Sequence, residues 1–248
     1  PLMHKNSVSG VAFSSDGTYL VSASLDHTAR VWHATSGDQV SPALRHGYLV
    51  RNAEFLPSGN RIMTTSGDGL IRIWEFRTHA NLLKIVRHAS AVKTCRLSPE
   101  GDRIVTASTD GTARVWNLRT AQPRQIVFKH DDEVREADFS RDGQLVVTAS
   151  ADGTARVWSA DDGRPVTGPL RHDGGVRHAE FSVDNRRVLT ASSGGAFIWD
   201  VQTGELVRKF GDVRSVRWAT YDSAGQQVLT CDDDGNGRVW DARTGQPI

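Results

Sequence analysis

Short runs rich in β-branched and aromatic residues alternate with polar turns along the whole chain. In one representative stretch, turns of Ser, Asp and Gly separate an apolar run over 134–139, a Val- and Thr-rich run over 144–150 and a third run that ends at Trp158. Because runs of this length between such turns form hairpins, we predict three antiparallel strands, and a fourth in the extended stretch that reaches His172. No window carries the apolar spacing of a helix, so the predicted fold class is all-β.

Tryptophan recurs along the chain at an almost constant interval. The spacings are 42, 42, 42, 41 and 41 residues between Trp32, Trp74, Trp116, Trp158, Trp199 and Trp240. A second series repeats every 42 residues and consists of His4, His46, His88, His130 and His172. A period of this length indicates supersecondary units that bury their apolar faces only by stacking on one another. We therefore predict a single repeat domain over residues 1–248, with repeats at approximately 1–41, 42–83, 84–125, 126–167, 168–208 and 209–248.

One motif recurs in phase with the tryptophans. It resembles the WD-repeat family in the fourth repeat, where His130 and then Asp142-Gly143 precede the string Thr-Ala-Ser-Ala-Asp-Gly-Thr-Ala-Arg-Val-Trp that ends at Trp158. The style of the repeats, with Leu-Arg-His before the first strand, is similar to bacterial members of that family. The resemblance covers the entire chain and implies a β-propeller of six four-stranded antiparallel blades, or seven if a unit is missing from this chain.

The resemblance also implies structural roles. In that family, a His, a Ser or Thr, an Asp and the Trp of each blade form a hydrogen-bonded chain. The residues at these places are His4, Asp26, Trp32, His46, Asp68, Trp74, His88, Asp110, Trp116, His130, Asp152, Trp158, His172, Trp199, Asp234 and Trp240. The hydroxyl stays open between two residues on one strand face: Ser22 or Ser24, Thr64 or Ser66, Thr106 or Ser108, and Thr148 or Ser150. Repeats five and six depart from the pattern, because Ser-Gly-Gly at 193–195 replaces the Asp turn and Asp212 replaces the His.

Composition predicts a cytoplasmic protein. Hydrophobic residues make up 38% of the chain and charged residues 24%, the mean hydropathy is −0.41, and no apolar run is long enough to span a membrane. Cys95 and Cys231 belong to repeats on opposite sides of a six-blade ring, too far apart for a disulfide, which favours a reduced compartment. No secretory segment is visible, and a chain that opens on Pro1 is expected to be an excerpt of a longer protein.

Motifs for catalysis and cofactor binding are absent from the sequence. There is no G-x-S-x-G elbow, phosphate-cradling glycine loop, H-E-x-x-H or paired C-x-x-C. The five periodic histidines stand at equivalent places in different repeats, so they are expected around a ring and not around one metal ion. We therefore expect no catalytic activity, no cofactor and no metal.

Cations occupy one equivalent position in five of the six repeats. This position follows the valine that opens the first strand, and its residues are Ser9, Arg51, Lys93, Arg135, Arg177 and Arg217. The resemblance places it at the rim of the propeller channel, and alternation predicts that Arg135 shares a strand face with Ala137 and Phe139. The cations that precede the periodic histidines are expected to extend this basic patch: Arg45, Arg87, Lys129 and Arg171. Trp218 stands beside Arg217, where a buried ring is expected and an exposed aromatic anchor is the alternative.

These features predict a non-catalytic protein–protein interaction scaffold or sensor domain, which the resemblance to bacterial WD-repeat regions places in a larger signalling protein. Its rim would bind partner proteins through acidic or phosphorylated segments, because cations around a concave mouth attract anions. In the competing interpretation, each rim cation pairs with a carboxylate such as Glu133, Glu136 or Asp233. Nucleic-acid or other polyanion binding is the alternative function, which a net charge of only +1 disfavours. A propeller enzyme is the third.

Overall fold

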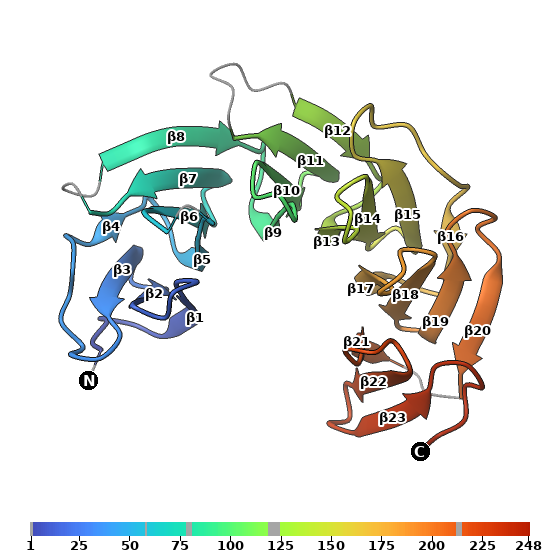
Figure 1. Cartoon of the computed structure of the whole chain (residues 1–248). Helices are drawn as coiled ribbons and strands as arrows, with labels where there is room; N and C mark the ends of the chain where they lie inside the picture. Colours follow the sequence, from blue (N-terminus) through green and yellow to red (C-terminus); the bar gives the residue numbers. More distant parts are fainter. Residues whose placement is uncertain (1, 58, 78–80, 119–124, 212–214) are drawn as a thin grey trace. The chain divides into compact units, whose positions relative to one another are not determined.

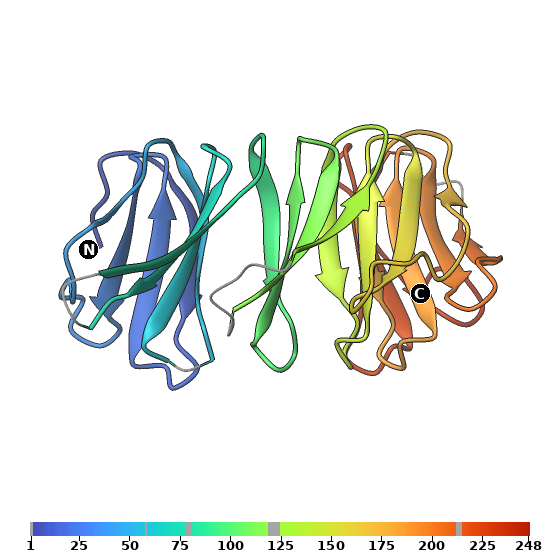
Figure 2. The same cartoon turned by 90° about the horizontal axis from the view of Figure 1, so that it is seen from above.

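The computed structural model describes residues 2–57, 59–77, 81–118, 125–211 and 215–248. This part of the chain contains 23 β-strands and no helix, so the predicted all-β fold class is confirmed. It follows that no described segment is a helix of the length and apolarity needed to cross a membrane. The strands form six antiparallel sheets, and within each sheet they lie side by side in chain order (Figures 1 and 2).

The chain has two compact units, Pro1–Cys95 and Arg96–Ile248. The first contains sheets 1 and 2, which have four strands each. Sheet 1 consists of β1 (Val8–Phe13), β2 (Tyr19–Ser24), β3 (Thr28–His33) and β4 (Leu44–Arg45). Sheet 2 consists of β5 (Val50–Phe55), β6 (Arg61–Ser66), β7 (Leu70–Glu75) and β8 (Asn81–Arg87).

The remaining strands form sheets 3 to 6. Sheet 3 consists of β9 (Val92–Leu97), β10 (Arg103–Ser108), β11 (Thr112–Asn117) and β12 (Gln125–Lys129). Sheet 4 consists of β13 (Val134–Phe139), β14 (Leu145–Ser150), β15 (Thr154–Ser159) and β16 (Leu170–Arg171). Sheet 5 consists of β17 (Val176–Phe181), β18 (Arg187–Ser192), β19 (Gly195–Asp200) and β20 (Leu206–Phe210). Sheet 6 consists of β21 (Val216–Tyr221), β22 (Gln227–Asp232) and β23 (Gly237–Asp241).

The described part of sheet 6 has three strands instead of the predicted four. In sheet 4, a single bridge between Trp158 and Pro165 starts the return of the chain along β15, and β16 forms a few residues later. Sheet 6 has the equivalent bridge between Trp240 and Pro247. The positions equivalent to β16 would come after Ile248, the last residue of the sequence.

A serine and an aspartate hold the turn between the first two strands of a sheet. The Ser140 hydroxyl donates a 2.6 Å hydrogen bond to Asp142 Oδ1, and the backbone N–H of Gln144 donates to the same oxygen. Between them, Gly143 has a φ of +69°, a left-handed conformation that glycine adopts without a steric penalty. Asn185, at the equivalent position of sheet 5, has a φ of +59°, because asparagine is one of the few other residues that tolerate it. The turn is therefore encoded locally.

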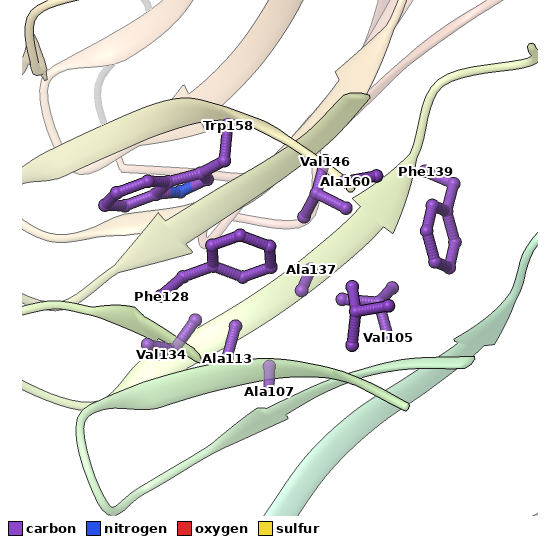
Figure 3. Close-up of a cluster of buried hydrophobic side chains, with 11 residues drawn as sticks. Val105, Ala107, Ala113, Phe128, Val134, Ala137, Phe139, Val146, Trp158 and Ala160 are labelled. Atoms are coloured by element: carbon purple, nitrogen blue, oxygen red, sulfur yellow. The ribbon is translucent and has the colours of Figure 1, made fainter. Parts of the chain in front are cut away.

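Apolar side chains fill the space between neighbouring sheets. Between sheets 3 and 4, Val105 and Val134 are fully buried in a cluster that also contains Phe128 of β12 and Trp158 of β15. The centroids of these two rings lie 5.3 Å apart, and Figure 3 shows them at one side of the cluster. Equivalent clusters lie between sheets 1 and 2, 4 and 5, and 5 and 6. In these four pairs, a repeat therefore completes its core against the next one.

A β-bulge interrupts the first strand at the position after its opening valine. In sheet 4, Val134 lies opposite Ser150 and Glu136 lies opposite Ala149, so Arg135 is an extra residue without a partner on β14. The same shift in register occurs at Ser9, Arg51, Arg177 and Arg217. An extra residue of this kind bends the strand and re-aims its side chains.

The bulge corrects the prediction made from strand alternation. Val134 and Ala137 are both fully buried although they are three residues apart, which strict alternation does not allow. Arg135 is half-buried, whereas Ala137 and Phe139 lie in the apolar cluster between sheets 3 and 4. The expectation that Arg135 shares a face with these two residues is therefore wrong.

Candidate functional site

A buried hydrogen-bonded chain links four side chains of the fourth repeat. The indole N–H of Trp158 donates to Thr148 Oγ1 over 2.9 Å, and the same oxygen lies 2.8 Å from His130 Nε2. Asp152 Oδ2, which faces His130 Nδ1, is a carboxylate oxygen and only accepts, so Nδ1 carries the ring proton and Nε2 of the neutral ring accepts from the Thr148 hydroxyl. That N–H donates to Asp152 Oδ2 over 2.9 Å. The chain ties β14 and β15 to the segment that precedes β13.

The indole hydrogen bond recurs in all six sheets and identifies which of the two hydroxyls takes part. The acceptors are Ser22, Thr64, Thr106, Thr148, Thr190 and Thr230, at 2.8 to 3.0 Å from the indole nitrogen. The serine two residues later has a different role. Ser150 donates to the carbonyl of Glu133 and accepts the backbone N–H of Asp152. It therefore holds the turn that presents the aspartate.

The hydrogen-bonded chain is complete in sheet 1 but interrupted in sheet 2, where His46 Nε2 has no partner among the described residues. In sheet 1, His4 Nδ1 lies 2.9 Å from Asp26 Oδ2, as in the fourth repeat. In sheet 2, Arg72 lies between His46 and Asp68, with Nη1 2.9 Å from His46 Nδ1 and Nη2 2.8 Å from Asp68 Oδ2. Since a guanidinium only donates, His46 Nδ1 is the acceptor. Burial and the Arg72 charge lower the pKa of His46 to about 4, so its ring is neutral near pH 7.

Sheet 3 shows what the arginine two residues before each tryptophan does. The guanidinium carbon of Arg114 lies 5.9 Å from the centre of the Trp116 ring, and its Nη2 lies 3.4 Å from Asp110 Oδ2. His88 of the same repeat is buried. The guanidinium lies over the indole and pairs with the turn aspartate, which is a structural role.

Sheet 5 lacks the turn aspartate, and the backbone takes its place. His172 Nδ1 lies 2.9 Å from the carbonyl oxygen of Leu170, and Nε2 lies 2.8 Å from Thr190 Oγ1. By the reasoning used for His130, Nδ1 carries the proton and donates to the carbonyl. Burial lowers the pKa of His172 to about 4.

In sheet 6, the structure gives the role of the turn carboxylate to Asp232 and not to Asp234. Asp232 is buried and accepts a 2.6 Å hydrogen bond from Arg238 Nη1. Asp234, the residue implied by the resemblance, is exposed. Asp212, which stands where the other repeats have histidine, lies outside the described residues. Over the described ranges, no three or more His, Cys, Asp or Glu side chains form a group that could hold a metal ion.

The predicted rim residues of the first unit lie at the starts of first strands. The Ser9 hydroxyl donates a 2.6 Å hydrogen bond to the carbonyl of Val50 on the neighbouring sheet. Arg51 is exposed, and Lys93 on β9 is half-buried. Ser9 thus connects sheets 1 and 2, whereas Arg51 presents its charge to solvent.

In the second unit, four of the predicted rim residues come together. Arg135, Arg177, Arg217 and Trp218 line one open hollow of about 500 Å³, with Asp233 as the fifth residue. The three arginines stand at the bulges of β13, β17 and β21. Equivalent positions of three consecutive sheets therefore converge on one concave surface, which we call the rim hollow.

Carboxylates pair with two of the three arginines in the rim hollow. Arg135 Nε lies 2.9 Å from Glu133 Oε1, and Arg177 Nη1 lies 2.6 Å from Asp233 Oδ2. Arg217 is exposed and forms no ion pair with any residue that the structure describes. Ion pairs within the chain therefore involve Arg135 and Arg177 and leave Arg217 available to a ligand.

Trp218 extends the rim hollow with an aromatic surface. Its ring is 43% exposed, so the expectation of a buried ring is wrong. One face lies against His178, with ring centroids 3.7 Å apart. His178 is itself buried and approaches the carboxylate of Glu136 to 3.6 Å, with Arg96 3.7 Å from the same carboxylate. Burial lowers the pKa of His178 to about 3 and raises the pKa of Glu136 to about 8.

The cations that precede the periodic histidines do not line the rim hollow. They lie on the fourth strands: Arg45 on β4, Arg87 on β8, Lys129 on β12 and Arg171 on β16. The fourth strand is at the opposite edge of its sheet from the first. Three strand spacings amount to roughly 14 Å. The expectation that these residues extend the basic patch is therefore wrong.

Comparison with known proteins identifies the repeated unit. The family model WD40 (WD domain, G-beta repeat) matches six segments, residues 2–33, 43–75, 80–117, 121–159, 164–200 and 204–241. Among solved structures, the chain is similar to the crystal structure of the computationally designed Ika8 protein. The two share 25% sequence identity with a TM-score of 0.82 over 99% of this chain and 74% of that one. No curated protein matches the chain.

Proposed function

The chain belongs to the WD40-repeat family (WD domain, G-beta repeat), and we propose that it is a non-catalytic module that binds acidic or phosphorylated segments of partner proteins in the rim hollow. Domains of this family typically mediate protein–protein interaction. The observation that carries the proposal is the position of Arg217, an arginine without an ion-pair partner among the described residues, beside the exposed Trp218.

The charges of the rim hollow favour an anionic ligand. Arg217 can offer two parallel N–H donors to a carboxylate or a phosphate, which is the strongest pairing that an arginine forms. Arg135 and Arg177 keep their own carboxylates at 2.9 and 2.6 Å and add to the local potential without being the first contact. A concave surface strengthens this potential, because it excludes part of the screening solvent.

The aromatic surface favours a peptide over a free ion. Trp218 exposes 43% of its ring beside Arg217, and His178 supports the other face of that ring. A tryptophan held from behind offers apolar area at a low cost in side-chain entropy, which is typical of residues that dominate protein interfaces. An acidic side chain on Arg217 would place its neighbouring residue on the indole.

The proposal includes a setting within a larger bacterial signalling protein of the cytoplasm. Its support is the resemblance of the repeats to bacterial WD-repeat regions. The absence of catalytic motifs from the sequence supports a binding role over an enzymatic one.

Charge reversal at Arg217 tests the proposal. The probes are a fluorescein-labelled polyglutamate peptide, its phosphoserine analogue and its glutamine analogue, and the measurement is fluorescence anisotropy at physiological salt. We expect the two acidic peptides to bind and the glutamine peptide to bind much more weakly. Arg217→Glu should weaken the acidic peptides at least about tenfold, the change expected from loss of one charge-assisted contact.

Arg164→Glu is the matched control. Arg164 is exposed and pairs with Asp162 in the turn after β15, so its reversal changes the net charge equally without touching the rim hollow. Equal loss of affinity in both variants would show that only overall charge matters and would contradict the proposal. Tighter binding of a single-stranded oligonucleotide, with a steep dependence on salt, would instead favour the nucleic-acid alternative.

A further inference from the structure

A guanidinium closes the groove between sheets 3 and 4 at the end opposite the first-strand bulges. Arg103, the first residue of β10, donates from Nη1 to Asp161 Oδ1 and from Nη2 to the carbonyl of Gly143, both over 2.8 Å. Its guanidinium carbon lies 5.5 Å from the centre of the Phe139 ring. One arginine thus covers an aromatic ring and bridges to a carboxylate of the next repeat.

The equivalent groove between sheets 5 and 6 has the same backbone and different side chains. Arg187 is the first residue of β18, as Arg103 is of β10, and Tyr221 ends β21, as Phe139 ends β13. Arg243 stands three residues after Trp240, the place that Asp161 holds after Trp158. A second cation has therefore replaced the carboxylate partner.

This exchange leaves the groove open. A pocket of about 690 Å³ is lined by Arg187, Tyr221 and Arg243, together with Gly225, which has the same φ of +69° as Gly143. Arg187 and Arg243 form no ion pair with any described residue. Two like charges now line the pocket at the sequence positions where the groove between sheets 3 and 4 pairs a cation with a carboxylate.

Tyr221, which lines this pocket, has an unused hydrogen-bond donor. The hydroxyl of Tyr221 is buried and has no partner within the described part of the chain. Burial raises the pKa of Tyr221 well above its ordinary value, so the hydroxyl keeps its proton and can donate. A buried hydroxyl without a partner costs stability, which a ligand acceptor would recover.

Two carboxylates in the pocket limit which anions fit. Asp184 Oδ1 already accepts from the Ser182 hydroxyl, and Asp241 Oδ1 accepts from the backbone N–H of Thr244. Both remain charged, since these hydrogen bonds lower the pKa of each carboxyl. They offset the charges of the two arginines, so a doubly charged phosphate would gain little. A ligand with a single negative charge is repelled less by these two aspartates than a doubly charged one.

We propose that the pocket between sheets 5 and 6 binds an organic monocarboxylate, which takes the place that Asp161 holds in the groove between sheets 3 and 4. The ligand carboxylate pairs with Arg187 and Arg243 and accepts the hydroxyl of Tyr221. Its carbon skeleton lies against Val183, which lines the same pocket. The carboxylate can belong to the C-terminus of a peptide or to a small organic acid. This site is separate from the rim hollow and its function does not depend on it.

Tyrosine NMR can detect the ligand directly. The chain has three tyrosines, so protein labelled with ¹³C in the tyrosine rings reports Tyr221 beside two internal references, Tyr19 and Tyr48. The probes are butyrate, an acetylated tetra-alanine peptide with a free C-terminus, its C-terminal amide, and inorganic phosphate. We expect the two carboxylates to shift the Tyr221 signal, and the amide and phosphate to leave it in place.

The two carboxylate probes distinguish the sources of the ligand. Tighter binding of the peptide assigns the pocket to a protein C-terminus, and tighter binding of butyrate assigns it to a small acid. The proposal is overturned if neither probe moves the Tyr221 signal up to about 50 mM, at which a ligand with a millimolar Kd saturates its site. It is equally overturned if phosphate shifts the signal as much as the carboxylates do.

Three variants connect the signal to the proposed contacts. Arg243→Asp should rebuild the ion pair found between sheets 3 and 4, weaken binding of the carboxylates at least about tenfold and leave the fold intact. Tyr221→Phe introduces the residue found at the equivalent position 139 and should also weaken binding of the carboxylates. Because this variant lacks the tyrosine signal, binding is measured from the backbone amide of Gly225. Arg186→Asp, an exposed neighbour outside the pocket lining, is the control and should bind as the unmodified chain does. Unchanged affinity in the first two variants would refute the assignment.

Discussion

The hydroxyl of Thr148 accepts a 2.9 Å hydrogen bond from the indole of Trp158, although the two residues lie ten positions apart on different strands. Thr148 is fully buried and also meets Nε2 of His130 at 2.8 Å. One oxygen atom therefore satisfies two buried polar side chains. The same arrangement around Thr190 holds Trp199 and His172 in sheet 5.

Removal of the Thr148 hydroxyl should lower the free energy of unfolding. Thr148→Val keeps the shape of the side chain but leaves the indole N–H and His130 Nε2 without a partner. Each buried group that loses its hydrogen bond costs about 1 to 3 kcal/mol, so we expect the free energy of unfolding to fall by about 2 to 4 kcal/mol. Urea titration followed by circular dichroism measures this difference.

Thr65→Val is the matched control. Thr65 lies on β6 and is as buried as Thr148, but its hydroxyl has no hydrogen-bond partner among the described residues. Removal of an unpartnered hydroxyl should leave the free energy of unfolding within about 0.5 kcal/mol of the original, or increase it. A similar loss in both variants would mean that the methyl-for-hydroxyl change itself is harmful, and that the indole bond contributes little.

The sequence predicts the sheets because their turns are encoded locally. A serine, an aspartate and a glycine within four residues form the first turn of sheet 4, as Ser140, Asp142 and Gly143 show, and the first turn of sheet 1 has the same three residue types. The choice between Thr148 and Ser150 could not be predicted in this way. Both are fully buried on one strand face, and only the register between β14 and β15 decides which of them lies beneath the indole.

The bulges and the second pocket depend on contacts between segments that are distant in sequence. No glycine or proline marks Arg135 as the extra residue of β13, so alternation gave the wrong face. The pocket between sheets 5 and 6 arises from Arg187 in one repeat and Arg243 in the next. An alignment of the repeats places Arg243 at the position equivalent to Asp161. The sequence does not show that this exchange removes an ion pair, because the contact between Arg103 and Asp161 is known only from the structure.

Protonation of His172 in the unfolded chain should destabilise the protein at a pH above that at which exposed carboxylates titrate. Burial lowers the pKa of His172 to about 4, whereas in the unfolded chain it is about 6.5. Between these values the unfolded state binds the extra proton, so the stability from neutral His172 is complete above pH 6.5 and is lost as the pH falls toward 4. We expect His172→Gln to reduce the loss of stability between pH 7 and pH 5 by about 2 kcal/mol.

The exposed His27 supplies the control for the acid experiment. It has a φ of +68°, which asparagine tolerates, so His27→Asn removes an imidazole without straining the backbone. Urea titrations at pH 7 and pH 5 should show the same pH dependence for this variant as for the unmodified chain. An equal change in both variants would mean that the pH dependence does not come from the buried ring of His172.

The buried Glu136 should produce the opposite trend at alkaline pH. Burial raises its pKa from 4.5 to about 8, although Arg96 lies 3.7 Å away. Between these values the folded state holds a proton that the unfolded state has lost, so stability decreases as the pH rises through this window. From pH 7 to pH 8, where the unfolded histidines are already neutral, we expect a decrease of up to about 1.4 kcal/mol.

Glu136→Gln should abolish this alkaline decrease, because the amide does not titrate. Glu205→Gln is the control, since Glu205 is exposed and its removal should leave the pH dependence unchanged. Urea titrations at pH 7 and pH 8 compare the three proteins. A decrease that persists in Glu136→Gln would assign the alkaline effect to another group.

Fluorescence quenching should report the sign of the potential in the rim hollow. Trp218 exposes 43% of its ring, whereas the other six tryptophans expose between 4 and 8%, so a quencher in solution reaches Trp218 almost alone. The hollow contains three arginines and one aspartate, so iodide should quench this indole more strongly than caesium does at equal ionic strength. Trp218→Phe should remove the quenchable fraction, and Arg217→Glu should reduce the preference for iodide. Equal quenching by the two ions in the unmodified chain would show that the arginine charges are neutralised by their carboxylates, which would also remove the electrostatic basis for capture of an acidic peptide.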